Sequence, residues 1–215
     1  MIEINNITKT YRKGDDEFTA LENVSFRINK GDFVCVFGPS GSGKSTLLNS
    51  IGGLIHPDSG DVLYYGKSLY NNEIDLDLFR KKEIGFMFQQ FHLMPYLTIY
   101  ENIRLACYER KQFEKTDHFL EKTSLTTLRY KYPSELSVGE KQRTAFIRAI
   151  ITNPALLLAD EPTGNLDPGN TEILLSLISE YKQNGGTVIV VTHDPLVREY
   201  ATRKMEMNKG KVTAD

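Results

Sequence analysis

The sequence of 215 residues predicts an α/β fold, with a mainly parallel sheet, an antiparallel β edge and an inserted helical region. Two continuously apolar runs, residues 155–159 and 187–192, are typical of strands buried on both faces of a parallel sheet. Between them, residues 171–182 place apolar side chains at helical spacing, and this helix should end at Asn184-Gly185-Gly186. A strand, a helix and a strand in succession favour parallel pairing.

The other predicted strands lie earlier in the chain. Residues 24–28 and 32–37 are rich in β-branched and aromatic residues and lie on either side of a turn at residues 29–31. Two further short runs of this kind are residues 60–66 and 84–88. Each is short and rich in β-branched or aromatic residues, as expected for strands.

The middle of the chain differs from both ends. From about residue 91 to residue 153 the patterns are helical, and no run has the composition of a strand. We therefore expect one domain over residues 1–215, in which a core of residues 1–90 and 154–215 is interrupted by a helical subdomain at about 91–153.

The composition excludes some classes of function. A formal net charge of −2 gives no overall basic surface, so we expect no nucleic-acid partner. Cys35 and Cys107 are far apart in the sequence and lack the spacing of a metal site. The amino terminus lacks the pattern of a signal peptide, and the apolar runs are too short to cross a bilayer. A role at a membrane would therefore need another protein to hold this one there.

A glycine-rich loop follows the predicted strand at residues 32–37 and precedes a predicted helix at 47–51. It consists of Gly38, Pro39, Ser40, Gly41, Ser42, Gly43, Lys44, Ser45 and Thr46. This is the P-loop pattern in its required context, so the core is expected to be a P-loop (RecA-like) nucleoside triphosphatase. Glycines let the backbone N–H groups surround phosphates. Lys44 would contact the β- and γ-phosphates, and the Ser45 hydroxyl would bind Mg²⁺.

Two acidic residues follow the apolar strand at residues 155–159. Asp160, at the end of that strand, is suited to hold Mg²⁺ through water. Glu161 is then placed to polarise an attacking water as a general base. The pair and the P-loop together predict hydrolysis of a nucleotide.

These motifs, with several others in a fixed order, resemble the nucleotide-binding subunit of ABC transporters. GPSGSGKST is similar to Walker A, and LLLADE to Walker B followed by the catalytic glutamate. LSVGEKQR (136–143) resembles the ABC signature, GNLD (164–167) the D-loop, and VTHD (191–194) the switch-histidine loop. Phe88-Gln89 resembles the Q-loop, and Tyr11 stands where the family has an aromatic residue that stacks on adenine. The resemblance covers nearly the whole chain and implies that it binds ATP and Mg²⁺.

The resemblance also implies roles for single residues. The catalytic residues are expected to be Glu161, His193, Lys44 and Gln89, and the magnesium ligands Ser45, Gln89 and Asp160. Outside the P-loop, the expected nucleotide contacts are Tyr11, Ser137, Gly139 and Asp167. His193 directly follows an apolar strand, which places it at the carboxyl edge of the sheet, where ligands bind in open α/β folds. Two assignments have alternatives: Tyr11 can equally be a packing tyrosine, and Gln90 adjoins Gln89.

The signature departs from its usual form, LSGGQ, at two positions. Val138 replaces the first glycine and Glu140 replaces the glutamine, whereas Ser137 and Gly139 are intact. Ser137 can cap the helix that begins here, and Gly139 would add backbone freedom. Val138 would slow turnover if its backbone had to adopt a positive φ. The resemblance implies that this helix serves the ATP of a second copy, so we expect a nucleotide-dependent homodimer.

Two stretches are similar to the MacB/LolD/FtsE branch of the family: DEPTGNLD at residues 160–167, and RxxxIGFxFQ at 80–89. The resemblance implies an ATPase on the cytoplasmic face of the cell membrane that drives a separate integral-membrane permease, in an exporter or a lipoprotein-, peptide- or antibiotic-type MacB/LolD system. The alternative is an FtsE-like ATPase that regulates cell-wall hydrolysis through a membrane partner. The permease would contact the apolar and aromatic stretch from Phe91 to Leu97, although these residues can instead fill the joint between core and helical subdomain.

Other classes of nucleotide-dependent protein fit less well. ABC-type ATPases of DNA repair usually carry a long coiled coil between the P-loop and the signature, and no heptads run through this insert. Translation-type ABC proteins have two cassettes in one chain, whereas this chain has one P-loop. A non-catalytic scaffold would not require both Glu161 and His193.

Overall fold

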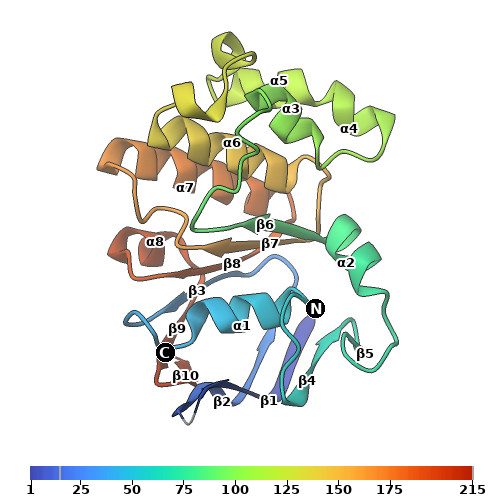
Figure 1. Ribbon diagram of the computed structural model, residues 1–215, viewed down its shortest axis with the longest axis vertical. Helices are drawn as coiled ribbons and strands as arrows, with labels where there is room; N and C mark the ends of the chain where they lie inside the picture. Colours follow the sequence, from blue (N-terminus) through green and yellow to red (C-terminus); the bar gives the residue numbers. More distant parts are fainter. Residues whose placement is uncertain (15, 215) are drawn as a thin grey trace.

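The computed structural model describes residues 1–14 and 16–214, which form two sheets and a set of helices (Figure 1). The larger sheet has six strands in the order β10-β9-β3-β8-β7-β6. They are β3 (Phe33–Phe37), β6 (Ile84–Met87), β7 (Leu156–Asp160), β8 (Thr187–Thr192), β9 (Arg203–Asn208) and β10 (Lys211–Ala214). Neighbouring strands pair in parallel, except that β10 is antiparallel to β9. The predicted α/β fold is confirmed.

The smaller sheet is antiparallel and has the order β2-β1-β4-β5. Its strands are β1 (Ile2–Lys13), β2 (Asp16–Ile28), β4 (Ser59–Tyr64) and β5 (Lys67–Ser68). The sequence patterns predict only the end of β2 and none of β1. The pairing of β1 with β2 shifts register between Ile4 and Ile7 and again before Thr10, and Asn6 and Asn23 have positive φ angles of 51° and 55°. Such irregularities interrupt the period of two on which strand prediction depends.

The larger sheet is buried on both faces. Alternate residues of its central strands point to opposite faces, and each face packs against other elements. On one face, Val34 and Ile189 belong to a cluster shared with the smaller sheet and with α1 (Lys44–Ile51), which lies between the sheets (Figure 1). On the other face, Phe33 and Val188 pack with α6 (Val138–Ile150), α7 (Pro168–Gln183) and α8 (Pro195–Tyr200). This double burial explains why the two predicted core strands read as continuously apolar.

Residues 88–155 form helices and turns and contain no strand. Besides α6, the helices are α3 (Ile99–Arg104), α4 (Arg110–Glu114) and α5 (Thr116–Lys122), with 3-10 turns at Thr126–Leu128 and Pro133–Glu135. Helices α3, α5 and α6 share a small core that includes Ile103, Leu120 and Ile147. In Figure 1, α3, α4 and α5 lie at the opposite end of the molecule from β1 and β2. Before β6, α2 (Leu76–Glu83) begins at Asp75, whose side chain accepts hydrogen bonds from two backbone N–H groups of the first turn.

The sequence patterns also miss the last three elements. Helix α8 has six residues, too few to display a helical period. In β9, the buried Met205 and Met207 alternate with Lys204, Glu206 and Asn208, residue types that are rare in strands. Here the sheet, and not the local propensity of the residues, decides the conformation.

Candidate functional site

The P-loop connects β3 to α1, and its backbone can be made only with glycine at two positions. A Cβ on Gly43 would lie 2.0 Å from the carbonyl oxygen of Ala20, and its φ is +106°. A Cβ on Gly38 would lie 2.0 Å from the carbonyl oxygen of Met207. Both contacts are with backbone atoms, which cannot turn away as a flexible side chain could. Because Gly38 and Gly43 lack side chains, the loop can pack closely against β2 and β9.

Lys44 extends back into this loop. Its ammonium donates hydrogen bonds to the carbonyl oxygens of Gly38 (2.8 Å) and Pro39 (3.0 Å), and the residue is only 7% exposed. The same nitrogen lies 3.9 Å from a carboxylate oxygen of Glu161. A buried cation in a loop of N–H groups is well suited to hold a phosphate chain.

Strand β7 ends at Asp160, which is half-buried beside the P-loop. Burial raises the pKa of its carboxyl group above the usual range, and the neighbouring Ser45 side chain opposes this shift. Oxygen Oδ1 is buried and has no hydrogen-bond partner among the described residues. An unpartnered carboxylate oxygen next to a serine hydroxyl suits a hard cation such as Mg²⁺, which prefers oxygen ligands.

Glu161 is the most extensively bonded acid of the site. Its Oε2 accepts hydrogen bonds from the Thr192 hydroxyl (2.8 Å) and the His193 backbone N–H (3.3 Å). Its Oε1 lies 3.0 Å from Nδ1 of His193. These groups meet because β7 and β8 pair in parallel, so that their carboxyl ends lie side by side. Glu161 also has a φ of +46°, a strained conformation of the kind found at functional sites.

A pocket of about 490 Å³ opens over the P-loop. It collects predicted site residues from distant parts of the chain: Tyr11, Ser40, Gly41, Gly43, Lys44, Ser45, Thr46, Gln89, Glu161 and His193. Gln90 does not line it, whereas Gln89 does. Ser137, Gly139 and Asp167 also lie outside its lining.

The pocket also contains an aromatic residue that sequence reasoning missed. Phe18 lines it, and the register of β1 with β2 places Phe18 directly opposite Tyr11. Both rings are substantially exposed, at 53% and 42%. A hairpin prediction across residues 11–18 would have paired them. An exposed aromatic pair beside a P-loop is a suitable surface for a purine base.

Ser137 is the N-cap of α6, as the sequence predicts. Its hydroxyl accepts a hydrogen bond from the Glu140 N–H (3.4 Å), and the Glu140 carboxylate accepts one from the Ser137 N–H (2.7 Å). The Ser137 hydroxyl also donates to this carboxylate, at 2.8 Å. This is a capping box, so Glu140 at the usual glutamine position has a clear structural role.

The next two residues, Val138 and Gly139, have ordinary helical backbone conformations. Val138 is the first residue of α6 and does not have a positive φ, so its β-branched side chain causes no backbone strain here. Gly139 does not have a positive φ either, and it is needed for space: a Cβ would lie 2.3 Å from Oδ1 of Asn170. The glycine thus allows α6 and α7 to approach each other closely.

Asn170 joins the signature to the segment predicted to be the D-loop. Its side chain accepts a hydrogen bond from Arg143 (2.7 Å) and donates one to Asp167 (2.6 Å). Asp167 caps α7 by accepting the Asn170 N–H, and these bonds lower the pKa of the Asp167 carboxyl. Sequence reasoning missed Asn170, because only the packing of α6 on α7 reveals its contacts.

The chain is similar over most of its length to proteins of one known family. A family model described as ABC transporter matches residues 21–164. The chain belongs to the ABC transporter family. A putative hemin import ATP-binding protein, HrtA, of Staphylococcus haemolyticus is 42% identical over 98% of both chains. LolD of Buchnera aphidicola, the ATP-binding protein of a lipoprotein-releasing system, is 43% identical over 91% of this chain and 89% of its own length. MacB of Chlorobaculum tepidum, a macrolide export protein, is 40% identical, and this ABC chain spans 34% of its length.

Solved structures agree with this assignment. The ATP-binding cassette MJ0796 of Methanocaldococcus jannaschii, in a dimeric post-hydrolysis state bound to ADP and Pi, superposes with a TM-score of 0.92 and 37% identity, covering 100% of this chain and 98% of that chain. A nucleotide-free ABC cassette gives a TM-score of 0.84 at 28% identity, covering 100% and 90%. The chain is thus the ATP-binding subunit of an ABC transporter of the MacB, LolD and HrtA type, and an ATPase.

In this ABC cassette, the segment from Phe91 to Leu97 is fixed by two side chains. Arg148 donates hydrogen bonds to the carbonyl oxygens of Phe91 and His92, both at 2.6 Å. Asn102 bonds to the backbone of Met94 and Leu97. Tyr96 is 71% exposed, so the segment combines a fixed backbone with an outward-facing aromatic ring. Neither of the two sequence interpretations covers all of these residues.

Proposed function

We propose that two copies of this cassette enclose two ATP molecules, each held by the P-loop of one copy and the signature of the other. The observation that carries this proposal is the separation of the two elements: Ser137 and Gly139 do not line the P-loop pocket of their own chain. The dimeric post-hydrolysis state of MJ0796, bound to ADP and Pi, supports the same arrangement.

Within each site, the residues have distinct roles. Lys44 exchanges its bonds to the loop carbonyls for bonds to the β- and γ-phosphates. Glu161 is the general base that removes a proton from the attacking water. His193, held beside Glu161, and Lys44 stabilise the negative charge that develops on the transferred phosphoryl group. Gln89, at the end of β6, orients the water.

Ser45, Asp160 and Gln89 are the proposed magnesium ligands. The unpartnered Oδ1 of Asp160 supports this assignment, because a bound cation would supply its missing partner. When bound, Mg²⁺ would neutralise charge on the β- and γ-phosphates. Tyr11 and Phe18 would stack on the adenine ring.

Coupling to a permease is proposed to occur at residues 91–97 and the groove beside them. This groove, of about 400 Å³, includes Phe88, His92, Leu105 and Arg148 in its lining. None of the helices in the described part of the chain is long and apolar enough to cross a membrane. Because a permease partner would hold the cassette, the proposed location is the cytoplasmic face of the cell membrane.

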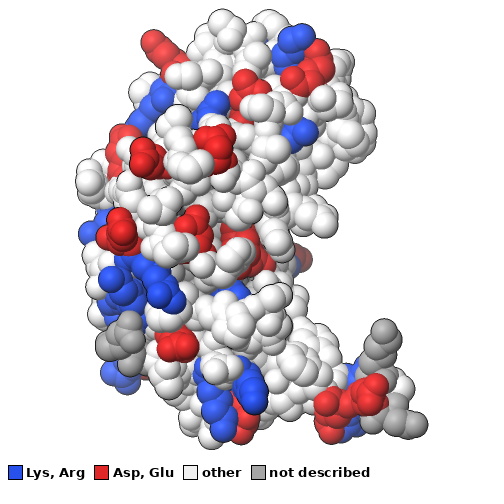
Figure 2. Space-filling model, turned by 90° about the vertical axis from the view of Figure 1, so that its left-hand side faces the viewer, with Lys and Arg blue, Asp and Glu red and all other residues white. Residues whose placement is uncertain are grey.

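The proposed cargo class follows the relatives, which are named for lipoprotein release, macrolide export and hemin import. We favour an exporter or lipoprotein-type system over the FtsE-like alternative, which no observation here favours. In Figure 2, acidic and basic side chains are interspersed on the described surface in view. We propose that residues 91–153 form the subdomain that transmits closure to the permease.

The first test is the Glu161→Gln substitution. It should reduce ATP hydrolysis by at least about 100-fold, because it removes the base, while ATP-driven dimerisation persists. Phosphate release and size-exclusion chromatography with ATP and Mg²⁺ measure the two properties. Glu121→Gln, at an exposed position of α5, is the matched control and should behave as wild type. Hydrolysis at the wild-type rate in Glu161→Gln would disprove the assigned role.

A further inference from the structure

The segment of residues 161–170 runs from Glu161, the proposed base, to the first turn of α7. Two hydrogen bonds attach the start of this segment to the end of β8. The Thr163 hydroxyl donates to the carboxylate of Asp194 (2.6 Å), and the Thr192 hydroxyl donates to that of Glu161 (2.8 Å). These bonds fix Glu161 relative to the sheet, and neither of them comes from the signature helix α6.

Helix α6 holds the same segment through one buried side chain. The amide nitrogen Nε2 of Gln142 donates a hydrogen bond to the carbonyl oxygen of Pro162, at 2.6 Å. Both residues are buried, and Pro162 directly follows Glu161. No other hydrogen bond to this oxygen is found in residues 1–14 and 16–214. The peptide next to the proposed base is thus fixed by a residue of α6.

Gln142 lies on the face of α6 that packs against α7, and these two helices lie side by side in Figure 1. Gly139, whose missing side chain makes room for Asn170, is three residues earlier and therefore on the same face. The next residue, Arg143, donates a hydrogen bond to Asn170 (2.7 Å). Adjacent residues of α6 thus hold both ends of the segment, Gln142 at Pro162 and Arg143 at Asn170. Because a helix transmits displacement as a rigid element, movement of the signature end would move this segment as well.

The backbone of Glu161 makes its position sensitive to this contact. Its φ of +46° is a strained conformation, which persists only where the surrounding structure holds it. Without Gln142, the carbonyl of Pro162 would be buried and unpartnered, which is costly. The segment would then rearrange to satisfy this oxygen, and Glu161 would shift with it.

We propose that Gln142 is a positioning residue, which ties Glu161 to the signature helix of the same chain. This inference rests on the proposed function, in which the signature contacts the ATP held by the second copy and Glu161 acts on the ATP of its own chain. Contact of the signature with that ATP fixes α6, Gln142 fixes Pro162, and Glu161 takes its working position. The signature helix therefore acts on two sites: directly on the ATP of the second copy, and through Gln142 on the base of its own site.

The first test is Gln142→Met in the full chain, which keeps the approximate shape of the side chain and removes the donor. The kcat for ATP hydrolysis should fall by about tenfold, while KM for ATP and ATP-driven dimerisation change by less than about twofold. Phosphate release over a range of ATP concentrations measures kcat and KM. Gln183→Met, the same change at an exposed position of α7, is the matched control. A raised KM with unchanged kcat would overturn the proposal.

Heterodimers assembled with two affinity tags show through which site Gln142 acts. Each contains one Glu161→Gln chain, so that one working base remains. With Gln142→Met in the chain that keeps Glu161, hydrolysis should fall by about tenfold relative to the heterodimer without it. With Gln142→Met in the Glu161→Gln chain, the loss should be less than about twofold, although the signature of that chain serves the working site.

The opposite pattern, in which the loss follows the Glu161→Gln chain, would show that Gln142 supports the contact of the signature with ATP, and would overturn the proposal. Equal losses in both arrangements would show a general effect on the fold and would overturn it too. If Gln142→Met does not fold, as judged by circular dichroism, Gln142→Asn takes its place, because its side chain is one methylene shorter and does not reach Pro162. Failure of the proposed function gives a different result: the wild-type rate per chain would then not rise with protein concentration.

Discussion

The P-loop and the signature each precede a helix whose start is proposed to bind phosphate, but the two helix starts are built differently. Helix α1 begins at Gly43, in the left-handed region, and no side chain caps its first N–H groups. Helix α6 begins at Ser137 in an extended conformation, and Ser137 and Glu140 cap each other. The P-loop therefore leaves its donors free for a ligand. The signature hydroxyl is already engaged within its own chain, so it must be released before it can bind phosphate.

This comparison predicts that the P-loop tolerates far less change than the signature. Gly43→Ala should weaken ATP binding by about 100-fold, since overpacking against the backbone of Ala20 costs about 3 kcal/mol. Gly41→Ala is the matched control: Gly41 also has a positive φ, of +77°, but a Cβ there meets nothing within 4 Å. The Gly41→Ala substitution should cost only about 1 kcal/mol of binding free energy. Fluorescent-nucleotide titration measures both. Equal losses would mean that φ, and not the contact with Ala20, decides.

At the signature, the corresponding substitution should act on dimerisation and not on ATP binding. In Gly139→Ala, the new Cβ meets the side chain of Asn170, which can move, so the fold should survive. Moving Asn170 breaks its bonds to Arg143 and Asp167, and ATP-driven dimerisation should fall by about tenfold. Gly169→Ala, whose Cβ would lie 3.4 Å from Asp167, is the control. Analytical ultracentrifugation with ATP distinguishes the two variants, and a normal Gly139→Ala dimer would contradict the proposal.

Asp160 offers a test through stability and pH. Its pKa is raised by burial, so the folded protein holds the proton more tightly than the unfolded chain, and ionisation at higher pH costs stability. Asp160→Asn should therefore raise the melting temperature of the metal-free protein at neutral pH, by about 2–4 °C for each kcal/mol relieved, while hydrolysis is lost.

The gain should shrink as the pH falls through the pKa of Asp160, because the wild-type carboxyl is then neutral as well. Asp16→Asn, at the exposed start of β2, should show no such trend. Thermal melts across a pH series measure it. A gain in the Asn variant that is constant with pH would show that burial of the charge is not the cause.

The smallest effect is expected at Glu140. Its carboxylate would lie near the phosphates of the partner's ATP and repel them, and it also holds the Ser137 hydroxyl. Glutamine keeps the capping box without the charge. Glu140→Gln should therefore strengthen ATP-driven dimerisation by about threefold at low salt, and the gain should fade at high salt. A gain independent of salt would point to hydrogen bonding and not to charge.

The sequence by itself determined the parts of the site that are local. In the P-loop, a glycine pattern and a lysine lie on consecutive residues, and Asp160, Glu161 and His193 follow apolar strands, whose parallel pairing brings their ends together. Ser137 could likewise be predicted as a cap, because a capping box spans four residues. Such signals need only a few neighbouring residues and the rule that ligands bind at the carboxyl ends of parallel strands.

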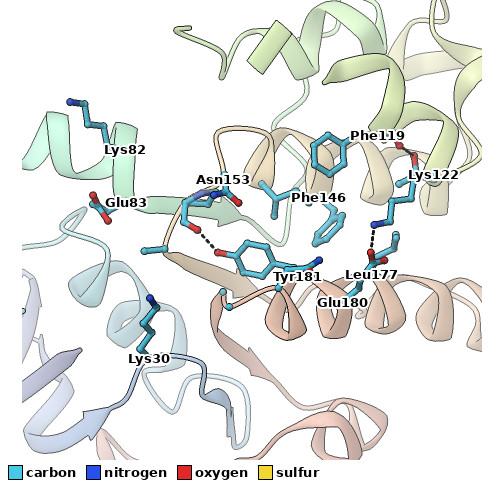
Figure 3. Close-up of a pocket in the computed structure, with 17 residues that line it drawn as sticks. Lys30, Lys82, Glu83, Phe119, Lys122, Phe146, Asn153, Leu177, Glu180 and Tyr181 are labelled. Carbon is cyan, nitrogen blue, oxygen red and sulfur yellow. Dashed lines mark hydrogen bonds and ion pairs between the residues drawn. The ribbon is translucent and has the colours of Figure 1, made fainter. Parts of the chain in front are cut away.

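Only the tertiary structure decided the contacts between distant segments. Phe18 faces Tyr11 because β1 pairs with β2, and the space at Gly139 is limited by Asn170 of another helix and not by the φ of Gly139. The methionine strand β9 forms because β3 supplies its hydrogen-bonding partner. A cavity of about 420 Å³ forms where α5, α6 and α7 converge (Figure 3). Each of these features depends on the packing of residues far apart in the chain, which a local sequence pattern does not report.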